Sequence, residues 1–444
     1  MCSALRLSVV LLLISTPGLL LAASPHAETY FVAPDGSGDF PTIQAAVDAA
    51  QDGDVIELGD GVFLGDGNRD IDMRGDALTI RSRNGMAESC ILDCQGSAAD
   101  PHRGFVFHSG ETAASRVADL KIIGGRAEFG GAIACAHSSP ELRGLILSYN
   151  EASESGGGVS CEGCEPTLVE CTFEQNECSV TGGGIWCDDA SPSLIECRFV
   201  DNYAFERGGG MRCDGASEPR IEGGAFLGNG AGIHGGGIYF YRLSEHAAYP
   251  ELDGVLFRDN RCENTGGALV TVWSSPTVTR CSFEHNYAPT NAGAVWCGGD
   301  SADPLFRNCT FHGSWGGTAG CFYCNAHCSL TLENCIISFG PHGIPVYSAD
   351  GSQVMVSCSD VYGNSEGDWV QCLGGLQHIN GNICEDPLFC YPQDNDLTLE
   401  ECSPCAPFTP PNEECDLIGA WPVGCGGSPV TTASWGMVKA LFRE

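Results

Sequence analysis

Short apolar runs alternate with glycine, asparagine and aspartate along most of this 444-residue chain, and the alternation has a nearly fixed period. The unit Gly182 to Asn202, GGGIWCDDASPSLIECRFVDN, is preceded by a similar unit from Gly156 to Asn176 and followed by one from Gly208 to Asn229. Aligned glycine pairs or their substitutes begin at positions 130, 156, 182, 208, 235, 266, 292 and 319. Such a repeat length is typical of a solenoid, a propeller or another array of stacked units.

Within one unit, the pattern predicts three short strands and three turns. Ile185 and Cys187 lie on the same side of a strand and face the interior, whereas Trp186 points outward. Phe199 belongs to a later strand, and Asn202 opens the next turn, where asparagine tolerates left-handed backbone geometry. The β-branched and aromatic strand residues and the glycine-rich corners exclude helical repeats. Each unit is therefore expected to form one triangular coil.

Equivalent residues of successive coils are expected to stack about 4.8 Å apart, which is the spacing of neighbouring strands. The alignment predicts stacks of phenylalanine inside the coil, of asparagine at a turn, and of cysteine in two rows. The asparagine and cysteine ladders include Asn176, Asn202, Asn229, Cys161, Cys187, Cys213, Cys171 and Cys197. The strand spacing lies inside the Cα–Cα range of a disulfide, which favours some bonds between coils, but inward cysteines could equally remain thiols.

The two ends of the chain depart from the repeat. Residues 1–27, with an apolar stretch from Leu7 to Leu21, are expected to be a signal peptide. A strand at Thr29 to Ala33 and a short amphipathic helix at Pro41 to Ala50 are expected to form an N-terminal cap at 28–54. The other predicted divisions are the solenoid at 55–383, with regular repeats at 130–340, a Cys- and Pro-rich closing coil and C-terminal cap at 384–425, and a linker and tail at 426–444.

Charge and cysteine content narrow the range of partners and compartments. The net charge of −36 argues against nucleic acid, because phosphate binding needs clustered lysine and arginine. Beyond the signal peptide, no stretch is apolar for long enough to span a membrane. Of the 27 cysteines only Cys2 precedes residue 28, and the even remainder in an exported chain indicates disulfides. We therefore expect an exported protein that is extracellular or associated with the cell surface or outer membrane.

Cys-x-x-Cys pairs leave a zinc site as an alternative to disulfides. They occur at Cys161/Cys164, Cys321/Cys324 and Cys402/Cys405. The export signal and the lack of a finger-like Cys/His quartet favour disulfides instead.

The coil pattern resembles the right-handed parallel β-helix, which is the fold of pectin lyases. The GGAI sequence at Gly130 to Ile133 and Phe-x-x-Asn elements such as Phe199 to Asn202 resemble the two repeat motifs of the polymorphic outer-membrane proteins. Val32 to Ala50 resembles the start of pectin methylesterases. The resemblance implies an all-β fold, a single-stranded right-handed parallel β-helix solenoid with three short strands in each coil of ~26 residues and a short N-terminal capping helix. It also implies adhesion at a cell surface.

The catalytic motifs of the related enzymes are missing from the sequence. The chain has neither the Gln-Asp-Thr-Leu-like and Asp-Phe-Ile-Phe-Gly elements of pectin methylesterases nor the Gly-His-Gly and paired Asp elements of polygalacturonases. No catalytic residue of these enzymes can be assigned to a position of this chain, so the resemblance does not favour an enzyme.

One outward row of the predicted coils consists of carboxylate side chains. Glu162, Asp188 and Asp214 should form a column of carboxylates about 4.8 Å apart. Such a column could bind Ca²⁺, or it could hold a carboxyl group with a raised pKa that acts as an acid or a base. The alternative is a solvated acidic stripe on a chain with 57 acidic residues.

A second outward row is rich in aromatic residues. Its members are Ala134, Ser160, Trp186, Arg212, Tyr239, Val270, Trp296 and Tyr323. Trp186, Tyr239, Trp296 and Tyr323 are the candidate ligand-binding residues, because exposed rings on a long face can stack on sugar rings. They could instead pack on one another or under the insertion at 239–250.

Two polar clusters precede the regular repeats. Asp66, Asn68, Asp70 and Asp72 resemble a calcium loop, but Ile71 replaces the required glycine, which favours an ordinary polar corner. A second cluster, Asp100, His102 and His108, contains the acid and base of a triad without an identifiable nucleophile.

The sequence therefore favours an exported cell-surface or extracellular protein that binds a polysaccharide or a surface partner through its lateral face, in the manner of an adhesin. Two alternatives stay open. One is a polysaccharide lyase or hydrolase with Glu162, Asp188 and Asp214 at its site, and the other is a purely structural envelope protein.

Overall fold

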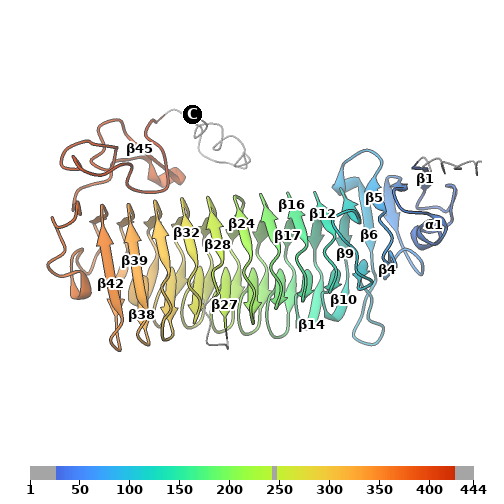
Figure 1. Ribbon diagram of the computed structural model, residues 1–444, viewed down its shortest axis with the longest axis horizontal. Helices are drawn as coiled ribbons and strands as arrows, with labels where there is room; N and C mark the ends of the chain where they lie inside the picture. The colour runs from blue at the N-terminus through green and yellow to red at the C-terminus, as the bar shows by residue number, and fades with distance from the viewer. Residues whose placement is uncertain (1–26, 243–247, 426–444) are drawn as a thin grey trace, which may run out of the picture.

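The computed structural model describes residues 27–242 and 248–425. Within these ranges the protein is a long solenoid of stacked parallel strands, with a helix at the N-terminal end and an irregular lobe near the C-terminal end (Figure 1). The all-β parallel solenoid predicted from the repeat is confirmed. The predicted signal peptide, apart from Ala27, and the predicted linker and tail at 426–444 lie outside the described residues.

The N-terminal strand and helix form where the sequence places them. β1 (Thr29–Val32) pairs in parallel with β2 (Val55–Leu58), the first strand of the solenoid. α1 (Ile43–Ala49) begins after Thr42, whose hydroxyl accepts a hydrogen bond from the Ala45 N–H and so satisfies a donor of the first helical turn. The apolar side of α1 is buried in the main core, so the helix covers the apolar end of the first coil.

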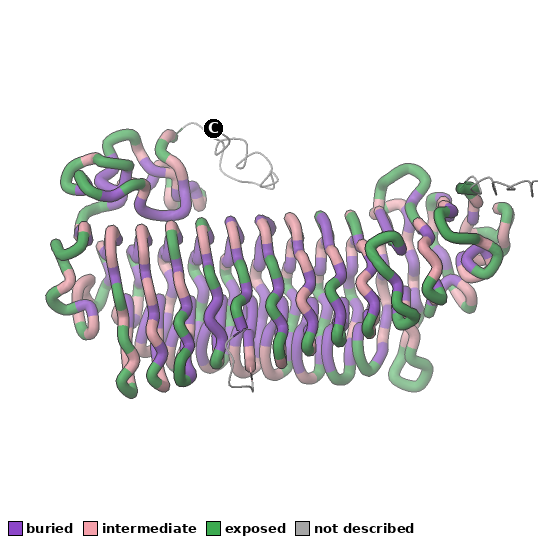
Figure 2. The backbone as a smooth tube through the Cα atoms, in the orientation of Figure 1, coloured by how far each residue is buried: buried purple, intermediate pink, exposed green. Residues whose placement is uncertain are grey.

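Each coil contributes to three long parallel sheets, which we call sheets A, B and C and which contain 13, 12 and 18 strands. One representative coil consists of β16 (Thr167–Val169) in sheet A, β17 (Thr172–Glu174) in sheet B, and the short β18 (Glu177–Cys178) followed by β19 (Ile185–Asp188) in sheet C. Sheet C is the largest because a coil such as this one adds two strands to it. Figure 2 shows the resulting alternation of buried and exposed positions along each coil.

The interior of the solenoid is built from the predicted ladders. Phe199 stacks between Phe173 and Phe226, with ring centroids 4.6 and 4.4 Å away. Asn202 Nδ2 donates a hydrogen bond to Asn229 Oδ1 at 3.0 Å and a second to the Phe173 carbonyl oxygen at 2.9 Å. The asparagines are buried, so these bonds satisfy amides that would otherwise lack a partner in the interior.

Neighbouring cysteines within the two rows are buried thiols that are not bonded to one another. Cys161, Cys187 and Cys213 are consecutive partners in sheet C, yet none of them is bonded to another cysteine, and Cys171 and Cys197 are unpaired as well. Parallel strands in register hold the Cβ atoms near the strand spacing of about 4.8 Å, whereas a disulfide needs about 3.5–4.5 Å. The favoured expectation of disulfides along these rows is wrong, and the alternative of thiols packed as small hydrophobic groups is confirmed.

The C-terminal segment lies beside the solenoid and not across its end (Figure 1). The last coil is covered by residues 364–383, among which Leu373 is buried in the main core. Residues 386–425 form a separate lobe that contains β44 (Phe389–Tyr391) and β45 (Asp396–Leu399) and has its own small apolar core. Residues 384–425, which were predicted to close the end of the solenoid, therefore do not cover its last coil, and most of them lie in the lobe beside it.

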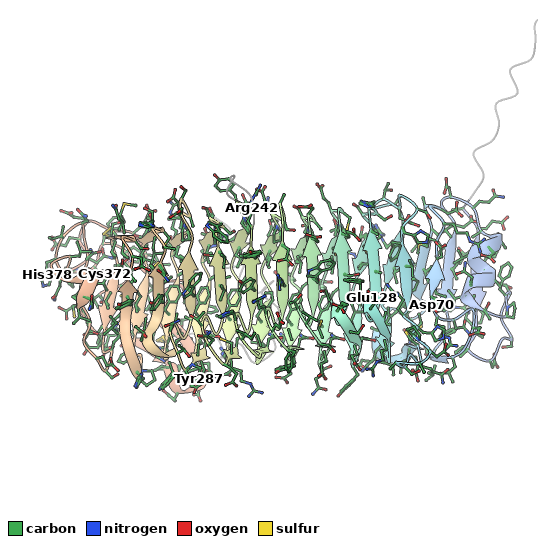
Figure 3. The ribbon with its side chains drawn as sticks, turned by 90° about the horizontal axis from the view of Figure 1, so that it is seen from below. Asp70, Glu128, Arg242, Tyr287, Cys372 and His378 are labelled. Atoms are coloured by element: carbon green, nitrogen blue, oxygen red, sulfur yellow. A yellow bond between two sulfur atoms is a disulfide. The ribbon has the colours of Figure 1, made fainter. Side chains whose placement is uncertain are left out.

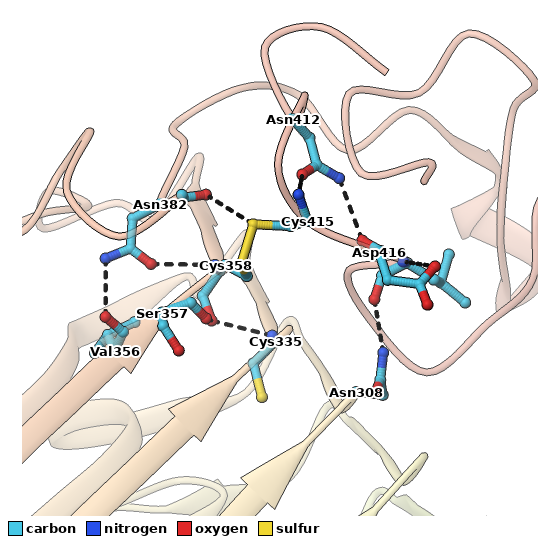
Figure 4. Close-up of a disulfide and its surroundings, with 12 residues drawn as sticks. Asn308, Cys335, Val356, Ser357, Cys358, Asn382, Asn412, Cys415 and Asp416 are labelled. Atoms are coloured by element: carbon cyan, nitrogen blue, oxygen red, sulfur yellow. Dashed lines mark hydrogen bonds between the residues drawn. A yellow bond between two sulfur atoms is a disulfide. The ribbon is translucent and has the colours of Figure 1, made fainter. Parts of the chain in front are cut away.

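The lobe docks on sheet B, at β33 (Ser282–Glu284), β37 (Thr310–His312) and β40 (Ile336–Ser338). Trp421 Nε1 donates a hydrogen bond to Ser282 Oγ at 3.2 Å, and Ile336 belongs to the apolar core of the lobe. An outward apolar residue on sheet B thus gives the lobe a surface to cover. The predicted disulfides do occur in this region: Cys358–Cys415 ties the lobe to the solenoid (Figure 4), and Cys390–Cys425 closes the lobe itself.

Candidate functional site

The candidate site is the outer surface of sheet C, which we call the sheet C face. Its long strands are β15 (Val159–Glu162), β19 (Ile185–Asp188), β23 (Met211–Asp214), β27 (Ile238–Tyr241), β31 (Leu269–Val272), β35 (Val295–Gly298), β38 (Trp315–Asn325) and β41 (His342–Ser348). Alternate residues of each strand point outward. In Figure 3, Tyr287 and Arg242 mark opposite long edges of the solenoid.

The aligned outward row has the predicted register. Its consecutive partners are Ala134, Ser160, Trp186, Arg212, Tyr239, Val270, Trp296 and Tyr323, and Tyr347 continues the row. The sequence therefore identified the members of the row, but not how far each one is exposed.

The carboxylate column is also in register, although its members differ in their surroundings. Glu162, Asp188 and Asp214 are consecutive partners on β15, β19 and β23. Glu162 is exposed to solvent. Burial, followed by the charges of Asp189, Asp214 and Glu162, raises the pKa of Asp188 above its ordinary value.

Both carboxylate oxygens of Asp214 accept hydrogen bonds from neighbouring side chains. Arg212 Nε donates a hydrogen bond to Asp214 Oδ1 at 2.8 Å, and Trp186 Nε1 donates one to Asp214 Oδ2 at 2.9 Å. A carboxylate held by a guanidinium and an indole is a poor metal ligand, because both of its oxygens already accept hydrogen bonds. Among the described residues, no three His, Cys, Asp or Glu side chains are arranged to hold a metal ion, so neither the Ca²⁺ interpretation of this column nor the zinc interpretation of the Cys-x-x-Cys pairs gains support.

Trp186 lies at the boundary of the acidic part of the face. Its indole is partly exposed and packs against Phe129, with ring centroids 5.6 Å apart. Because its N–H is bound to Asp214, the orientation of the ring is fixed.

Tyr239, in the middle of the face, is only 7% exposed and cannot offer an open ring to a ligand. The guanidinium carbons of Arg212 and Arg207 lie 5.5 and 5.8 Å from its ring centroid, and His234 is 6.2 Å away, centroid to centroid. Burial, with a smaller effect of Arg207, lowers the pKa of His234 to about 4, so the imidazole is neutral at pH 7. The alternative expectation, in which ring residues pack on their neighbours, applies to Tyr239.

The part of the face from β27 to β41 presents partly exposed rings. Trp296 and Tyr323 are direct partners on β35 and β38, and the Tyr323 ring stacks on Tyr347 at a centroid distance of 5.0 Å. Trp273, just after β31, is 40% exposed and lies 5.9 Å from Tyr241, centroid to centroid. These five aromatic residues form one surface, which we call the aromatic half of the face.

Sequence reasoning missed three members of the aromatic half. Tyr241 stands two positions after Tyr239, so strand alternation could have found it. Tyr347 lies beyond the regular repeats, where the period shortens. Trp273 follows a strand end and has a left-handed backbone with φ of 51°, so the parity of the strand gives no information about its direction.

The two polar clusters near the N-terminus form one contact region. His102 Nδ1 lies 2.5 Å from Asp70 Oδ2, and His108 Nε2 lies 3.4 Å from Asp72 Oδ2. The Asp70 carboxylate also accepts a hydrogen bond from the Arg103 N–H, so it fixes the backbone that carries His102.

The rest of these clusters serves local structure. Asp66 pairs with Arg69, and the Asn68 side-chain oxygen accepts a hydrogen bond from the Ile43 N–H at the start of α1. Asp100 lies on the other side of His102, with its Oδ2 3.2 Å from His102 Nε2. The polar-corner interpretation fits these contacts, because they join successive irregular coils and the N-terminal helix.

Comparisons with known proteins address the fold. The model of the right-handed beta helix region matches residues 128–283 and 230–383. No curated protein matches the chain. Among solved structures, the catalytic domain of Agl-KA is similar over 76% of this chain and 69% of that chain, with 11% identity and a TM-score of 0.35. In the described part of the chain, no helix has both the length and the apolar character that a membrane span requires.

Proposed function

Because the chain belongs to the right-handed β-helix family, we propose that it binds a polysaccharide with the outer face of one of its three sheets. The observation that supports this function is the row of partly exposed aromatic residues on the sheet C face, where Trp296, Tyr323 and Tyr347 follow one another in register. Strand pairing fixes the spacing of these rings at about 4.8 Å per coil. A rigid row of rings can contact an extended sugar chain without the cost of ordering the protein.

We further propose that the protein acts outside the cell or at its surface. The apolar stretch from Leu7 to Leu21, which is typical of a signal peptide, supports this location. A surface protein with a long lateral row of sugar-binding rings would function as an adhesin.

A lyase or hydrolase built on the carboxylate column is less well supported. Of its three members, Asp214 is held by Arg212 and Trp186, and Glu162 is open to solvent. A glycosidase needs two available carboxyl groups that flank the bond to be cleaved.

Affinity electrophoresis and calorimetry of the full mature chain, with a panel of soluble and insoluble polysaccharides, test the proposal. We expect retention by at least one polysaccharide, and we expect Trp296→Ala to weaken binding about tenfold, which corresponds to about 1.4 kcal/mol. Tyr149→Ala is the matched control, because Tyr149 is 64% exposed but lies outside the sheet C face. No retention by any polysaccharide would overturn the proposal in favour of a structural role, and new reducing ends in the bound fraction would favour an enzyme.

A further inference from the structure

The charges on the sheet C face are unevenly distributed along the solenoid. β15, β19 and β23 carry the outward Glu162, Asp188, Arg212 and Asp214. In contrast, β27, β31, β35 and β41 contain no Asp or Glu and no Lys or Arg, and neither does β38. The aromatic half is therefore an uncharged surface on a chain with a net charge of −36.

Two consecutive glycines make room for the indoles of this half. A Cβ atom at Gly298 would collide with the six-membered ring of Trp296, and one at Gly299 would collide with the indole of Trp273. Gly298 and Gly299 are separate from the corner of the repeat, which in this coil consists of Ala292 and Gly293. The pair allows both indoles to lie close to the backbone, so that they widen the surface instead of projecting from it.

Neutral polar groups accompany the rings. Asn325 is the partner of Gly298 on the neighbouring strand, and its side-chain oxygen accepts a hydrogen bond from the Ala326 N–H, which directs the amide group. The phenol of Tyr323 is protonated at neutral pH, as phenols ordinarily are, and burial, then Tyr347 and Asp350, raise its pKa further. Amide and phenol groups donate to and accept from hydroxyl groups without requiring a charge on the ligand.

The charges that border the aromatic half are unfavourable for an anion. Asp300 and Asp350 are exposed at the corner that follows the strands, and His327 Nδ1 lies 2.9 Å from Asp300 Oδ1. Arg242 follows β27 at the same corner (Figure 3), and it already takes part in an interaction within the chain. A carboxylated or sulfated polysaccharide would meet acidic groups here and would lack the arginine or lysine that such groups need as partners.

We infer that the ligand is an uncharged polysaccharide and that it lies over the aromatic half of the face, on Trp273, Trp296, Tyr323 and Tyr347. This inference rests on the proposed function and adds the chemical class of the ligand and its place on the face. The hydroxyl-rich, uncharged chain stacks its apolar ring faces on the indoles and phenols and exchanges hydrogen bonds with Asn325. The acidic half, with Glu162 and Asp188, does not contribute to affinity.

The test compares neutral and anionic polysaccharides that share a backbone. Hydroxyethyl cellulose and carboxymethyl cellulose form one such pair, and neutral xylans, mannans and galactans with their carboxymethylated forms supply others. Affinity electrophoresis of the full mature chain at low and at physiological salt should show retention by at least one neutral polysaccharide and at least tenfold weaker retention by its anionic counterpart. Raising the salt should narrow this difference, because screening weakens the repulsion.

Variants locate the ligand on the face. We expect Trp296→Ala and Trp273→Ala each to weaken binding about tenfold, and Glu162→Gln to change it less than twofold. Trp273 stands outside the strands and is 40% exposed, so its variant keeps the test informative if Trp296→Ala does not fold.

Each outcome separates the inference from the proposed function. Tighter binding of the anionic member of a pair, or a loss in Glu162→Gln as large as that in Trp273→Ala, would overturn the inference and leave polysaccharide binding intact. Absence of binding to every polysaccharide of either charge would overturn the proposed function itself.

Discussion

Trp186 Nε1 and Asp214 Oδ2 lie 2.9 Å apart and join two neighbouring coils by a hydrogen bond between side chains that are not strand partners. In the sheet, Trp186 is the partner of Arg212, and Asp214 is the partner of Asp188. The indole therefore leans along the strand toward the carboxylate. This bond and the ion pair of Arg212 with Asp214 connect the aromatic row and the carboxylate column, which sequence reasoning treated as separate, into one network.

Removal of the charge on Asp214 should destabilise this part of the solenoid. Asp214→Asn leaves the Arg212 guanidinium, whose side chain is only 13% exposed, without its ion-pair partner. We expect the free energy of unfolding to fall by about 3 kcal/mol, the lower end of the cost of breaking a buried ion pair. Chemical denaturation measures the change. Glu162→Gln, on the exposed member of the same column, should change the free energy of unfolding by less than about 0.5 kcal/mol. Equal effects of the two variants would show that the contacts of Asp214 with Arg212 and Trp186 do not contribute to stability.

The asparagine ladder should contribute more than a single hydrogen bond. Asn202 accepts hydrogen bonds from the Asn176 N–H and Nδ2 and donates to Asn229 Oδ1. Asn202→Ala leaves buried donors and acceptors unpaired on both neighbouring coils, and we expect a loss of about 2–4 kcal/mol. Because the coils of a solenoid contact only their neighbours, hydrogen exchange should increase near 176–229 and stay unchanged near the C-terminal lobe. The exposed Glu177 offers a control in Glu177→Ala, which should leave exchange at the ladder unaltered.

The unpaired cysteines of the two rows should react as free thiols once the protein is unfolded. The 22 unpaired cysteines of the described residues are almost all buried, and Cys402 is exposed. A thiol reagent added without reductant should therefore modify Cys402 first in the folded protein and should reach all 22 only after denaturation. Mass spectrometry of the labelled peptides identifies the sites, and the peptides of Cys358–Cys415 and Cys390–Cys425 should remain linked. Linked peptides that contain Cys161 and Cys187 would contradict the thiol ladder.

The attachment of the C-terminal lobe should weaken as the pH rises. Asp360, in β43 (Asp360–Tyr362), is fully buried and accepts a hydrogen bond from the Cys405 thiol of the lobe at 3.4 Å. Burial raises the pKa of Asp360 from its ordinary 3.8 to about 8, and the nearby Asp368 and Glu385 add to the shift. The unfolded chain therefore releases this proton first, so the stabilisation is complete below about pH 4 and is lost as the pH rises to about 8.

Asp360→Asn provides the check on this pH dependence. The amide stays neutral at every pH, so limited proteolysis of residues 386–425 and the melting temperature should vary less between pH 4 and 8 than in the wild type, with the variant more resistant at pH 8. Asp386→Asn, at an exposed position of the same lobe, is the control. Unchanged pH profiles in Asp360→Asn would exclude Asp360 as the titrating group.

Most of the architecture could be predicted because the repeat specifies neighbours directly. A fixed period tells which residues of successive coils are partners, and the two-residue alternation of a strand tells which of them face inward. The register of Phe199, Asn202, Trp186 and Asp188 follows from these two rules alone. The N-terminal helix could be predicted because its apolar spacing and its cap residue are local features.

Other features depend on distances and on contacts that no period contains. The repeat alignment makes Cys161 and Cys187 partners on neighbouring coils. Parallel pairing, however, sets the separation of their Cβ atoms and so decides that they remain thiols. Tyr239 and Trp296 occupy the same row, yet the side chains of Arg207, Arg212 and His234 pack against the first while the second stays partly exposed.

The sequence by itself determined the coil, its strands and the rows of side chains, since these depend on residue spacing along the chain. Only the tertiary structure decided which members of the rows are exposed, that Asp214 is bound to Trp186 and Arg212, and that the C-terminal lobe docks on part of sheet B. Those outcomes depend on side chains from separate coils and from the lobe, which meet in three dimensions at positions that parity and period do not specify.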